Sequence, residues 1–229
     1  MPQLVLIHGS GYTHDSFREQ TAAFPEADAT SLPGHPEGQA LASVGEIADW
    51  LERYVRWKDR GPAVVAGNSL GGAIAMEWAL RYPADAAGLI LIGTGARLRV
   101  SQRIFELIDD RWPASIKTLV DFGLGPRASA ELRSRACEWH RIVGQKSTRT
   151  DYAACNEFDA MDRVADINAP TLIVVGSEDK LTPPKFSRYL NEKIASSSLL
   201  EVEGAGHLVM AERPDIVNRA IRDFQATLR

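Results

Sequence analysis

Cysteine is scarce in this sequence, since only Cys137 and Cys155 occur among 229 residues. Two cysteines are too few for a disulfide framework, and these two lack the paired spacing that a zinc site needs. We therefore interpret both as free thiols that pack in the interior. A chain of this length buries roughly 70% of the surface that it exposes when unfolded, so it needs neither a disulfide nor a metal for stability.

Long apolar runs and a large net charge are also missing. No stretch approaches the roughly 18 apolar residues of a membrane span, and the run from Leu4 to Ile7 is too short for the core of a signal peptide. The formal net charge of -4 favours no polyanionic partner such as nucleic acid. We therefore expect a cytoplasmic protein that acts on a small molecule and binds neither nucleic acid nor membrane. The oligomeric state stays open.

Short apolar runs recur along the chain and predict the strands of a sheet. They lie at 4–7, 63–66, 89–92, 172–175 and, less cleanly, 199–202. Continuous rather than alternating apolarity marks strands that are covered on both faces, as in a parallel sheet. Helical patterns lie between most of these runs, at 44–57 and 70–82, and a final helix begins at Pro214. The alternation predicts an α/β fold with a mostly parallel sheet and helices on both faces.

The stretch from about Ala96 to Ala160 interrupts this alternation. It holds no strand candidate and its apolar spacing is helical. Eleven basic and nine acidic residues give it a charge of +2, whereas the remainder of the chain carries -6. We interpret residues 96–160 as a helical cap inserted into a single domain, whose core consists of residues 1–95 and 161–229.

Side chains of this inserted segment are candidates for binding a substrate. Its aromatic residues could line an apolar pocket, although such residues also hold cap helices to a core. They are Phe105, Trp112, Phe122, Trp139, Tyr152 and Phe158, of which we favour Trp112, Trp139 and Phe158. Arginines such as Arg97, Arg99 and Arg103 could attract an anionic acid portion, but a surplus of two charges does not decide this.

The strongest local signal is the segment Gly67-Asn68-Ser69-Leu70-Gly71-Gly72, which lies between an apolar strand candidate and a helix. A serine in a tight strand-to-helix turn needs neighbours without bulk, and Gly67 and Gly71 meet that need. Such a turn lifts the Ser69 hydroxyl above the sheet edge, where the start of the helix presents the Leu70 N–H to developing negative charge. The alternative is a glycine-rich turn with a helix-capping serine.

A serine nucleophile needs a base, and the base needs a group that orients it. His207 follows the last strand candidate in a glycine-rich segment, and Asp179, which we prefer over its neighbour Glu178, follows the strand candidate before it. A buried Asp179 would fix the tautomer of His207 and stabilise its protonated form. The turn after the first strand candidate can supply a second oxyanion donor, the Ser10 N–H. All these positions follow strands, where open α/β sheets place their sites, although a surface histidine and a solvated turn are the alternatives.

Residues 67–72, the His8-Gly9 turn, Asp179 and His207, in this chain order, closely resemble the α/β-hydrolase superfamily over nearly the whole chain. Within it, the sequence is most similar to small capped carboxylesterases and non-metal haloperoxidase-like members. The resemblance implies an α/β-hydrolase fold with Ser69 as nucleophile, Asp179 and His207 as its partners, and Ser10 and Leu70 as oxyanion donors. It implies hydrolysis of a carboxylic ester of a small molecule through an acyl-enzyme, and neither a metal nor an organic cofactor.

The sequence departs from the family pattern at three points. It begins at what resembles the third strand of the family fold, Pro36 stands where many members have glycine, and Asn68 replaces a histidine that is common before the nucleophile. Asparagine at this position also occurs among hydrolases that cleave carbon–carbon bonds in ring-cleavage products, but those relatives generally carry tryptophan where this chain has Leu208. Carbon–carbon hydrolysis is therefore the alternative reaction, and a non-catalytic member that binds a small ligand is the alternative class.

Overall fold

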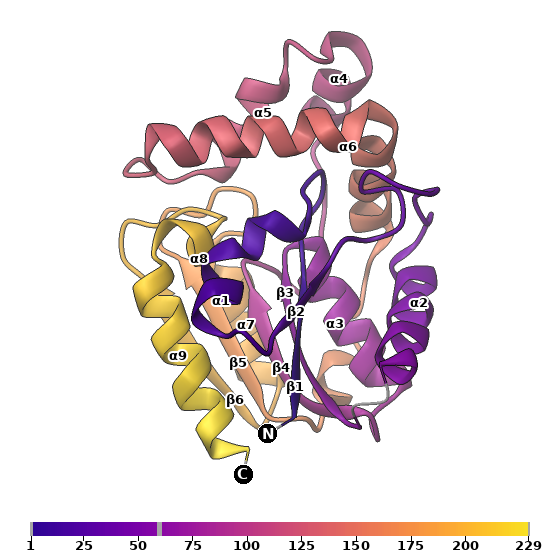
Figure 1. The fold of residues 1–229 in the computed structure, drawn as a ribbon, viewed down its shortest axis with the longest axis vertical. Coiled ribbons are helices and arrows are strands. Elements are labelled where there is room, and N and C mark those ends of the chain that lie inside the picture. Colours follow the sequence, from indigo (N-terminus) through magenta and orange to yellow (C-terminus); the bar gives the residue numbers. More distant parts are fainter. Residues whose placement is uncertain (1, 59–60, 229) are drawn as a thin grey trace.

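The computed structural model describes residues 2–58 and 61–228, and within them a six-stranded sheet carries helices on both faces (Figure 1). The strands lie in the order β2-β1-β3-β4-β5-β6, and every neighbouring pair is parallel. They are β1 (Gln3–Ile7), β2 (Asp28–Thr30), β3 (Ala63–Asn68), β4 (Ala86–Ile92), β5 (Thr171–Gly176) and β6 (Ser197–Val202). The predicted α/β fold is confirmed, and β2 is an edge strand that the apolar runs did not predict.

The continuous apolar runs are explained by the two faces of the sheet. In β4, Leu89 and Leu91 belong to one buried cluster, whereas Ile90 and Ile92 belong to a second cluster. Because successive side chains of a strand point to opposite faces, a strand covered on both sides needs an apolar residue at every position. The covering helices are α1 (Arg18–Ala23), α2 (Val44–Trp57), α3 (Leu70–Arg81), α7 (Pro184–Lys193), α8 (Val209–Glu212) and α9 (Pro214–Thr227), with 3₁₀ turns at His14–Phe17 and Val164–Asp166.

Helix α3 is the most enclosed of these helices, because α2 packs on it from outside while the sheet lies beneath it. Ten of its twelve residues are buried. It begins directly after β3, so the residue at that junction is held between two buried elements.

None of the helices in the described ranges is long and apolar enough to cross a membrane.

Three further helices lie between β4 and β5 in sequence and above the carboxyl ends of the strands (Figure 1). They are α4 (Gln102–Arg111), α5 (Ile116–Gly123) and α6 (Ala130–Glu157), and α6 is interrupted at Gly144, where φ is 81°. An antiparallel bridge joins Arg97 to Asp159, where the chain leaves and re-enters the core. The division of the chain into core and cap at residues 96 and 160 stays a prediction.

Candidate active site

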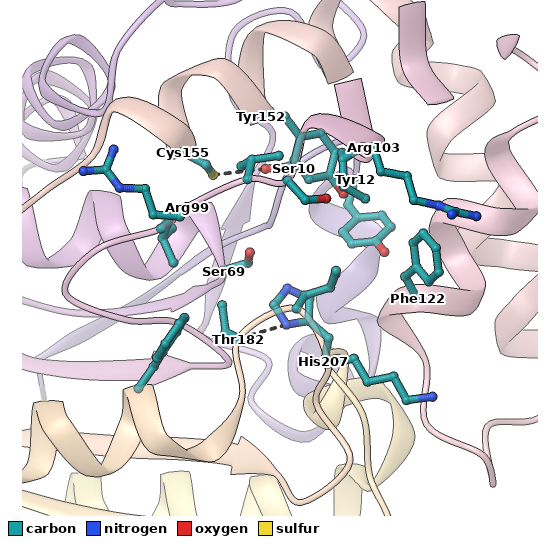
Figure 2. Close-up of a pocket in the computed structure, with 17 residues that line it drawn as sticks. Ser10, Tyr12, Ser69, Arg99, Arg103, Phe122, Tyr152, Cys155, Thr182 and His207 are labelled. Atoms are coloured by element: carbon teal, nitrogen blue, oxygen red, sulfur yellow. Dashed lines mark hydrogen bonds between the residues drawn. The ribbon is translucent and has the colours of Figure 1, made fainter. Parts of the chain in front are cut away.

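The loops that follow four different strands meet at the carboxyl edge of the sheet and enclose a cavity of about 290 Å³ (Figure 2). Ser10, from the loop after β1, Ser69, from the β3–α3 junction, and His207, from the loop after β6, all line it. Asp179, from the loop after β5, lies behind His207 and is 3% exposed. The structure therefore brings together the residues that the sequence proposed as nucleophile, base and orienting acid.

Ser69 occupies a strained backbone conformation, with φ 55° and ψ −113°. It is the one residue other than glycine with positive φ in the described part of the chain. The turn is closed by bare backbone, because a Cβ at Gly67 would lie 2.0 Å from the Gly71 oxygen and a Cβ at Gly71 would lie 2.2 Å from the Ile7 oxygen. Strain of this kind persists only where the surroundings enforce it, and the buried helix α3 does so here.

His207 is fixed by a buried carboxylate. Its Nδ1 lies 2.8 Å from Asp179 Oδ2, and only 3% of His207 is exposed. The other oxygen, Asp179 Oδ1, accepts hydrogen bonds from Leu181 N and Thr182 N, both at 2.9 Å. The Thr182 hydroxyl donates to Asp179 Oδ2 at 2.8 Å. A carboxylate can only accept hydrogen bonds, so the contact with Asp179 places the ring proton on Nδ1. The other ring nitrogen, Nε2, is then without a proton and can act as a base.

Ser69 and His207 face the same space without a direct hydrogen bond. Among the hydrogen bonds of the described residues, none joins the Ser69 hydroxyl to the imidazole. Figure 2 shows the Ser69 hydroxyl on the side of the ring that carries the second nitrogen, away from Thr182. Hydrogen bonds between catalytic groups are often long in unliganded enzymes and tighten when substrate binds.

Asn68 precedes Ser69 in the turn of residues 67–72, called the nucleophile turn after the role proposed for Ser69, and it holds the loop of His207 against the strand edge. Its Nδ2 donates to the His207 carbonyl oxygen at 3.1 Å and to the Ile92 carbonyl oxygen at 3.2 Å. The side chain is fully buried. The departure from the family pattern at this position thus has a structural use, because Asn68 joins the nucleophile turn to the histidine loop.

Glu212 holds the same loop from the other side. Its carboxylate accepts from Gly206 N, at 3.1 Å and 3.0 Å, and from Gly125 N at 3.1 Å. Burial raises the pKa of this carboxyl group. The His207 N–H in turn donates to the Gly123 oxygen at 2.7 Å, so the histidine loop is tied to the α5–α6 connection.

Two backbone N–H groups are available for an oxyanion next to Ser69. A Cβ at Gly9 would lie only 3.3 Å from the Ser69 Cβ, which shows how closely the loop after β1 approaches the nucleophile turn. Within residues 2–58 and 61–228, the Ser10 N–H donates to no backbone or side-chain acceptor. The Leu70 N–H is the first of α3 and has no acceptor inside the helix. Neither N–H group therefore has an acceptor among the described residues, and their role as oxyanion donors stays a prediction.

A buried His35–Asp151 contact that the sequence did not predict fixes the loop after β1. Asp151 on α6 accepts from the Gly11 N–H at 2.8 Å, and the same oxygen lies 2.8 Å from His35 Nε2. Both side chains are 2% exposed. Burial opposes the charge of His35, but the hydrogen bond to Asp151 and its negative charge outweigh burial and raise the pKa of His35. The His35–Asp151 pair therefore holds Gly11, the residue that follows Ser10.

The neighbouring His8 is neutral by contrast. Burial and the nearby His35 lower the pKa of His8 to about 3. Its Nδ1 lies 2.9 Å from the Gly9 oxygen, and its Nε2 accepts from Leu32 N at 3.0 Å. His8 thus supports the turn after β1, and its ring joins that turn to the segment that carries His35.

Asp151→Asn is expected to lower kcat about tenfold and the free energy of unfolding by about 2 kcal/mol, because a neutral amide replaces the charged acceptor of Gly11 N–H and His35. The folded-state pKa of His35 is raised, so its stabilisation is complete below the ordinary pKa of about 6.5 and is lost as the pH rises through the raised pKa. The stability difference between wild type and variant should therefore be larger at about pH 5.5 than at about pH 9. Urea unfolding at both pH values measures it, and an equal difference at both would refute the charged pair.

The cavity wall consists mainly of apolar and aromatic side chains. They are Tyr12, Leu98, Val100, Ile104, Phe122, Tyr152, Leu181 and Phe186. Phe122 and Tyr152 belong to the wider aromatic set that the sequence proposed. Tyr12 and Phe186 come from outside residues 96–160 and were not predicted.

The three favoured aromatic residues do not line this cavity. Trp139 is 3% exposed and donates from Nε1 to Asp15 Oδ2 at 3.0 Å. Phe158 is buried in the cluster on the α3 face of the sheet, and Trp112 packs against the α4–α5 cluster. Residue type alone led to their selection, whereas the face of each helix that carries them decides what they contact. In this structure Trp139 and Phe158 join the segment 96–160 to the rest of the protein, whereas Trp112 packs against a cluster within that segment.

The two cysteines are free thiols. Cys155 is buried, and its Sγ lies 3.4 Å from Ser10 Oγ at the cavity wall, whereas Cys137 is half-buried. Burial raises the pKa of Cys155 to about 12, so it stays protonated at neutral pH. In the part of the chain that the structure describes, no group of three or more His, Cys, Asp or Glu residues could hold a metal ion.

Comparisons with known proteins agree with this arrangement. The family model described as "Alpha/beta hydrolase family" matches residues 4–220. Pimeloyl-[acyl-carrier protein] methyl ester esterase of Neisseria meningitidis is 24% identical over 97% of this chain and 92% of its own length. A thermophilic esterase of known structure is 30% identical, with a TM-score of 0.88 over 98% of this chain and 90% of its own.

BpoC of Mycobacterium tuberculosis, which is described by its resemblance to non-heme bromoperoxidases, shares the fold, with a TM-score of 0.84, 21% identity, and coverage of 100% of this chain and 93% of its own. The family match extends over nearly the whole chain, and it includes the strands of the sheet except for Gln3 and the loops that carry Ser69, Asp179 and His207. The family match and the two esterases support a hydrolase with an esterase-like function. The chain belongs to the α/β-hydrolase family.

Proposed function

We propose that the protein hydrolyses a carboxylic ester of a small molecule through an acyl-enzyme on Ser69. Ser69 Oγ attacks the ester carbonyl carbon while His207 Nε2 takes the hydroxyl proton, and the carbonyl oxygen becomes an oxyanion. The oxyanion collapses, the bond to the leaving alcohol breaks, and His207 gives its proton to that alcohol. Water then loses a proton to His207 and attacks the acyl-enzyme, which releases the acid and restores Ser69.

The observation that carries this proposal is the buried His207–Asp179 pair beside the strained Ser69. Asp179 has hydrogen bonds from Leu181 N, Thr182 N and the Thr182 hydroxyl, so its orientation does not depend on the imidazole. A carboxylate fixed in this way stabilises the imidazolium that forms during attack. In this proposal the Ser10 and Leu70 N–H groups next to Ser69 are the oxyanion donors, and each such donor contributes about 3 kcal/mol to lowering the barrier in comparable sites.

The segment 96–160 supplies part of the substrate-binding wall in this proposal. Ile104 on α4, Phe122 on α5 and Tyr152 on α6 line the cavity that holds Ser69. Its volume of about 290 Å³ suits a small molecule. Residues 96–160 therefore act as a cap that shapes substrate choice, over a core of residues 1–95 and 161–229.

Covalent labelling with a fluorophosphonate probe tests the proposal. The wild-type protein is expected to bind one probe at Ser69, located by mass spectrometry of the labelled peptide, and to hydrolyse a short-chain aryl ester. The exposed Ser134 on α6 offers a matched control, since Ser134→Ala should label like wild type. A folded protein whose Ser69 never reacts would favour a ligand-binding function instead. Analysis of the products distinguishes ester from carbon–carbon hydrolysis.

A further inference from the structure

Cationic side chains surround the proposed active-site cavity. Arg99, Arg103 and Lys180 contribute to its lining, and no Asp or Glu is among the described residues that do so. The chain as a whole has more acidic than basic residues, 30 against 26. The charge of the cavity lining is thus opposite in sign to that of the protein.

Two of these cations have no partner among the described residues. Arg99 donates to the Asn156 oxygen at 3.1 Å and lies 3.7 Å from Asp159 Oδ2. Arg103 and Lys180, by contrast, form neither a hydrogen bond nor an ion pair with any described residue. Their charges are not neutralised.

Other arginines of the same segment do find carboxylates. Arg133 pairs with Asp121 at 2.8 Å, and Arg149 pairs with Asp109 at 2.9 Å. Both pairs lie away from the cavity lining. Arg111, Arg127 and Lys146 also lack a carboxylate partner among the described residues, but none of them lines the cavity. Arg103 and Lys180 are therefore the unpaired cations of the cavity lining.

The cavity changes in character from its base to its rim. His207 and Ser10 at the base are 3% and 5% exposed, whereas Arg103 and Lys180 are exposed to solvent. The apolar side chains of Ile104, Phe122 and Leu181 also line the cavity. Figure 2 shows Arg103 and Ser69 at opposite sides of it. A bound molecule that fills the cavity would therefore contact Ser69, the apolar wall and the positively charged side chains of Arg103 and Lys180.

We propose that the substrate of this site is an ester that carries a negatively charged group, and that Arg103 and Lys180 bind that group at the rim while Ser69 attacks the ester carbonyl. The apolar wall takes the hydrocarbon between the two ends. This inference rests on the proposed esterase function and adds the chemical class of its substrate. The charge can reside on the acyl or the alcohol portion, and the test distinguishes them.

Isosteric pairs of esters test the proposal. Monomethyl glutarate and methyl glutaramate place the charge on the acyl side, since carboxylate and primary amide have the same shape and differ in charge. O-acetyl glycolate and O-acetyl glycolamide form the second pair, in which the charge lies on the alcohol side of the ester. In one of the two pairs, the wild-type enzyme is expected to favour the anionic ester by about tenfold in kcat/KM, chiefly through a lower KM, because two exposed cations each attract it modestly. The preference should shrink as salt is added.

Substitutions assign the preference to the two side chains. The double variant Arg103→Gln/Lys180→Gln is expected to lose the preference, whereas the charge-conserving variant Arg103→Lys/Lys180→Arg should keep most of it. Arg219→Gln, on the exposed side of α9, removes one positive charge away from the cavity and controls for net charge. No preference in either pair, or a preference that survives in the double Gln variant, overturns the proposal.

Failure of this inference and failure of the esterase function give different results. If the neutral esters are hydrolysed in a manner that depends on Ser69 but charge has no effect, only the inference fails. If no ester is hydrolysed, calorimetric binding of glutarate still tests the rim. Glutarate is then expected to bind wild type and to bind the double Gln variant at least about tenfold more weakly, and equal binding refutes the cationic rim.

Discussion

Ser69→Ala is expected to lower kcat for a short-chain aryl ester by at least about 10⁴-fold, because removal of the nucleophile of a Ser-His-Asp site leaves only the contributions of the oxyanion donors and of binding. The two N–H groups at Ser10 and Leu70 stay in place in this variant. Initial rates at saturating ester, corrected for the spontaneous reaction, measure the loss. Turnover close to that of wild type would remove Ser69 from the mechanism.

The fold of the Ser69 variants provides the control. Alanine and serine both carry a Cβ, so Ser69→Ala keeps the strain at φ 55° and should unfold near the same urea concentration as wild type. Ser69→Gly should be equally inactive but more stable than Ser69→Ala by about 1 kcal/mol, because glycine populates positive φ without steric cost. Inactivity that came from unfolding would instead lower the stability of both variants together.

The sequence predicted those parts of the fold whose position in the structure demands a particular residue pattern along the chain. Strands β1, β3, β4 and β5 lie inside the sheet, so both of their faces must be apolar and the pattern identifies them. Strand β2 is at the edge, and its residues Asp28–Thr30 are only half-buried. No apolar run is required of a short edge strand, and its pairing with β1 depends on tertiary structure.

The residues of the candidate site also differ in whether a local requirement makes them visible in the sequence. Gly67 and Gly71 are required by backbone approaches within the nucleophile turn and to β1, so the motif is visible in the sequence. The contact of Asp151 with Gly11, by contrast, joins residues 140 positions apart. Nothing in the sequence around Asp151 indicates that contact, because it depends on where α6 crosses the loop after β1. The sequence likewise does not indicate which face of each helix lines the cavity, because that also depends on how the helices are placed in the tertiary structure.

Asp179→Asn is expected to lower kcat by about 10⁴-fold while the cavity keeps its shape, since a similar change in a comparable triad has this effect by selecting the wrong tautomer. Leu181 N and Thr182 N both donate to Asp179 Oδ1, so the amide oxygen of the variant must stay at that position. The amide nitrogen then replaces Oδ2 and donates to His207 Nδ1. The ring proton moves to Nε2, which can no longer accept the proton of Ser69.

Glu178→Gln is the matched control for this prediction, because it removes the same charge from the adjacent, exposed residue of the same loop. If Asp179 acts through the tautomer of His207, Glu178→Gln should retain kcat within about twofold, whereas a loss shared by both variants would point to the charge of the loop. The rate of fluorophosphonate labelling should fall in parallel with kcat in Asp179→Asn, since both reactions need Nε2 as a base. Labelling at the wild-type rate would place Asp179 outside the activation of Ser69 and leave it with a role in fixing the loop after β5.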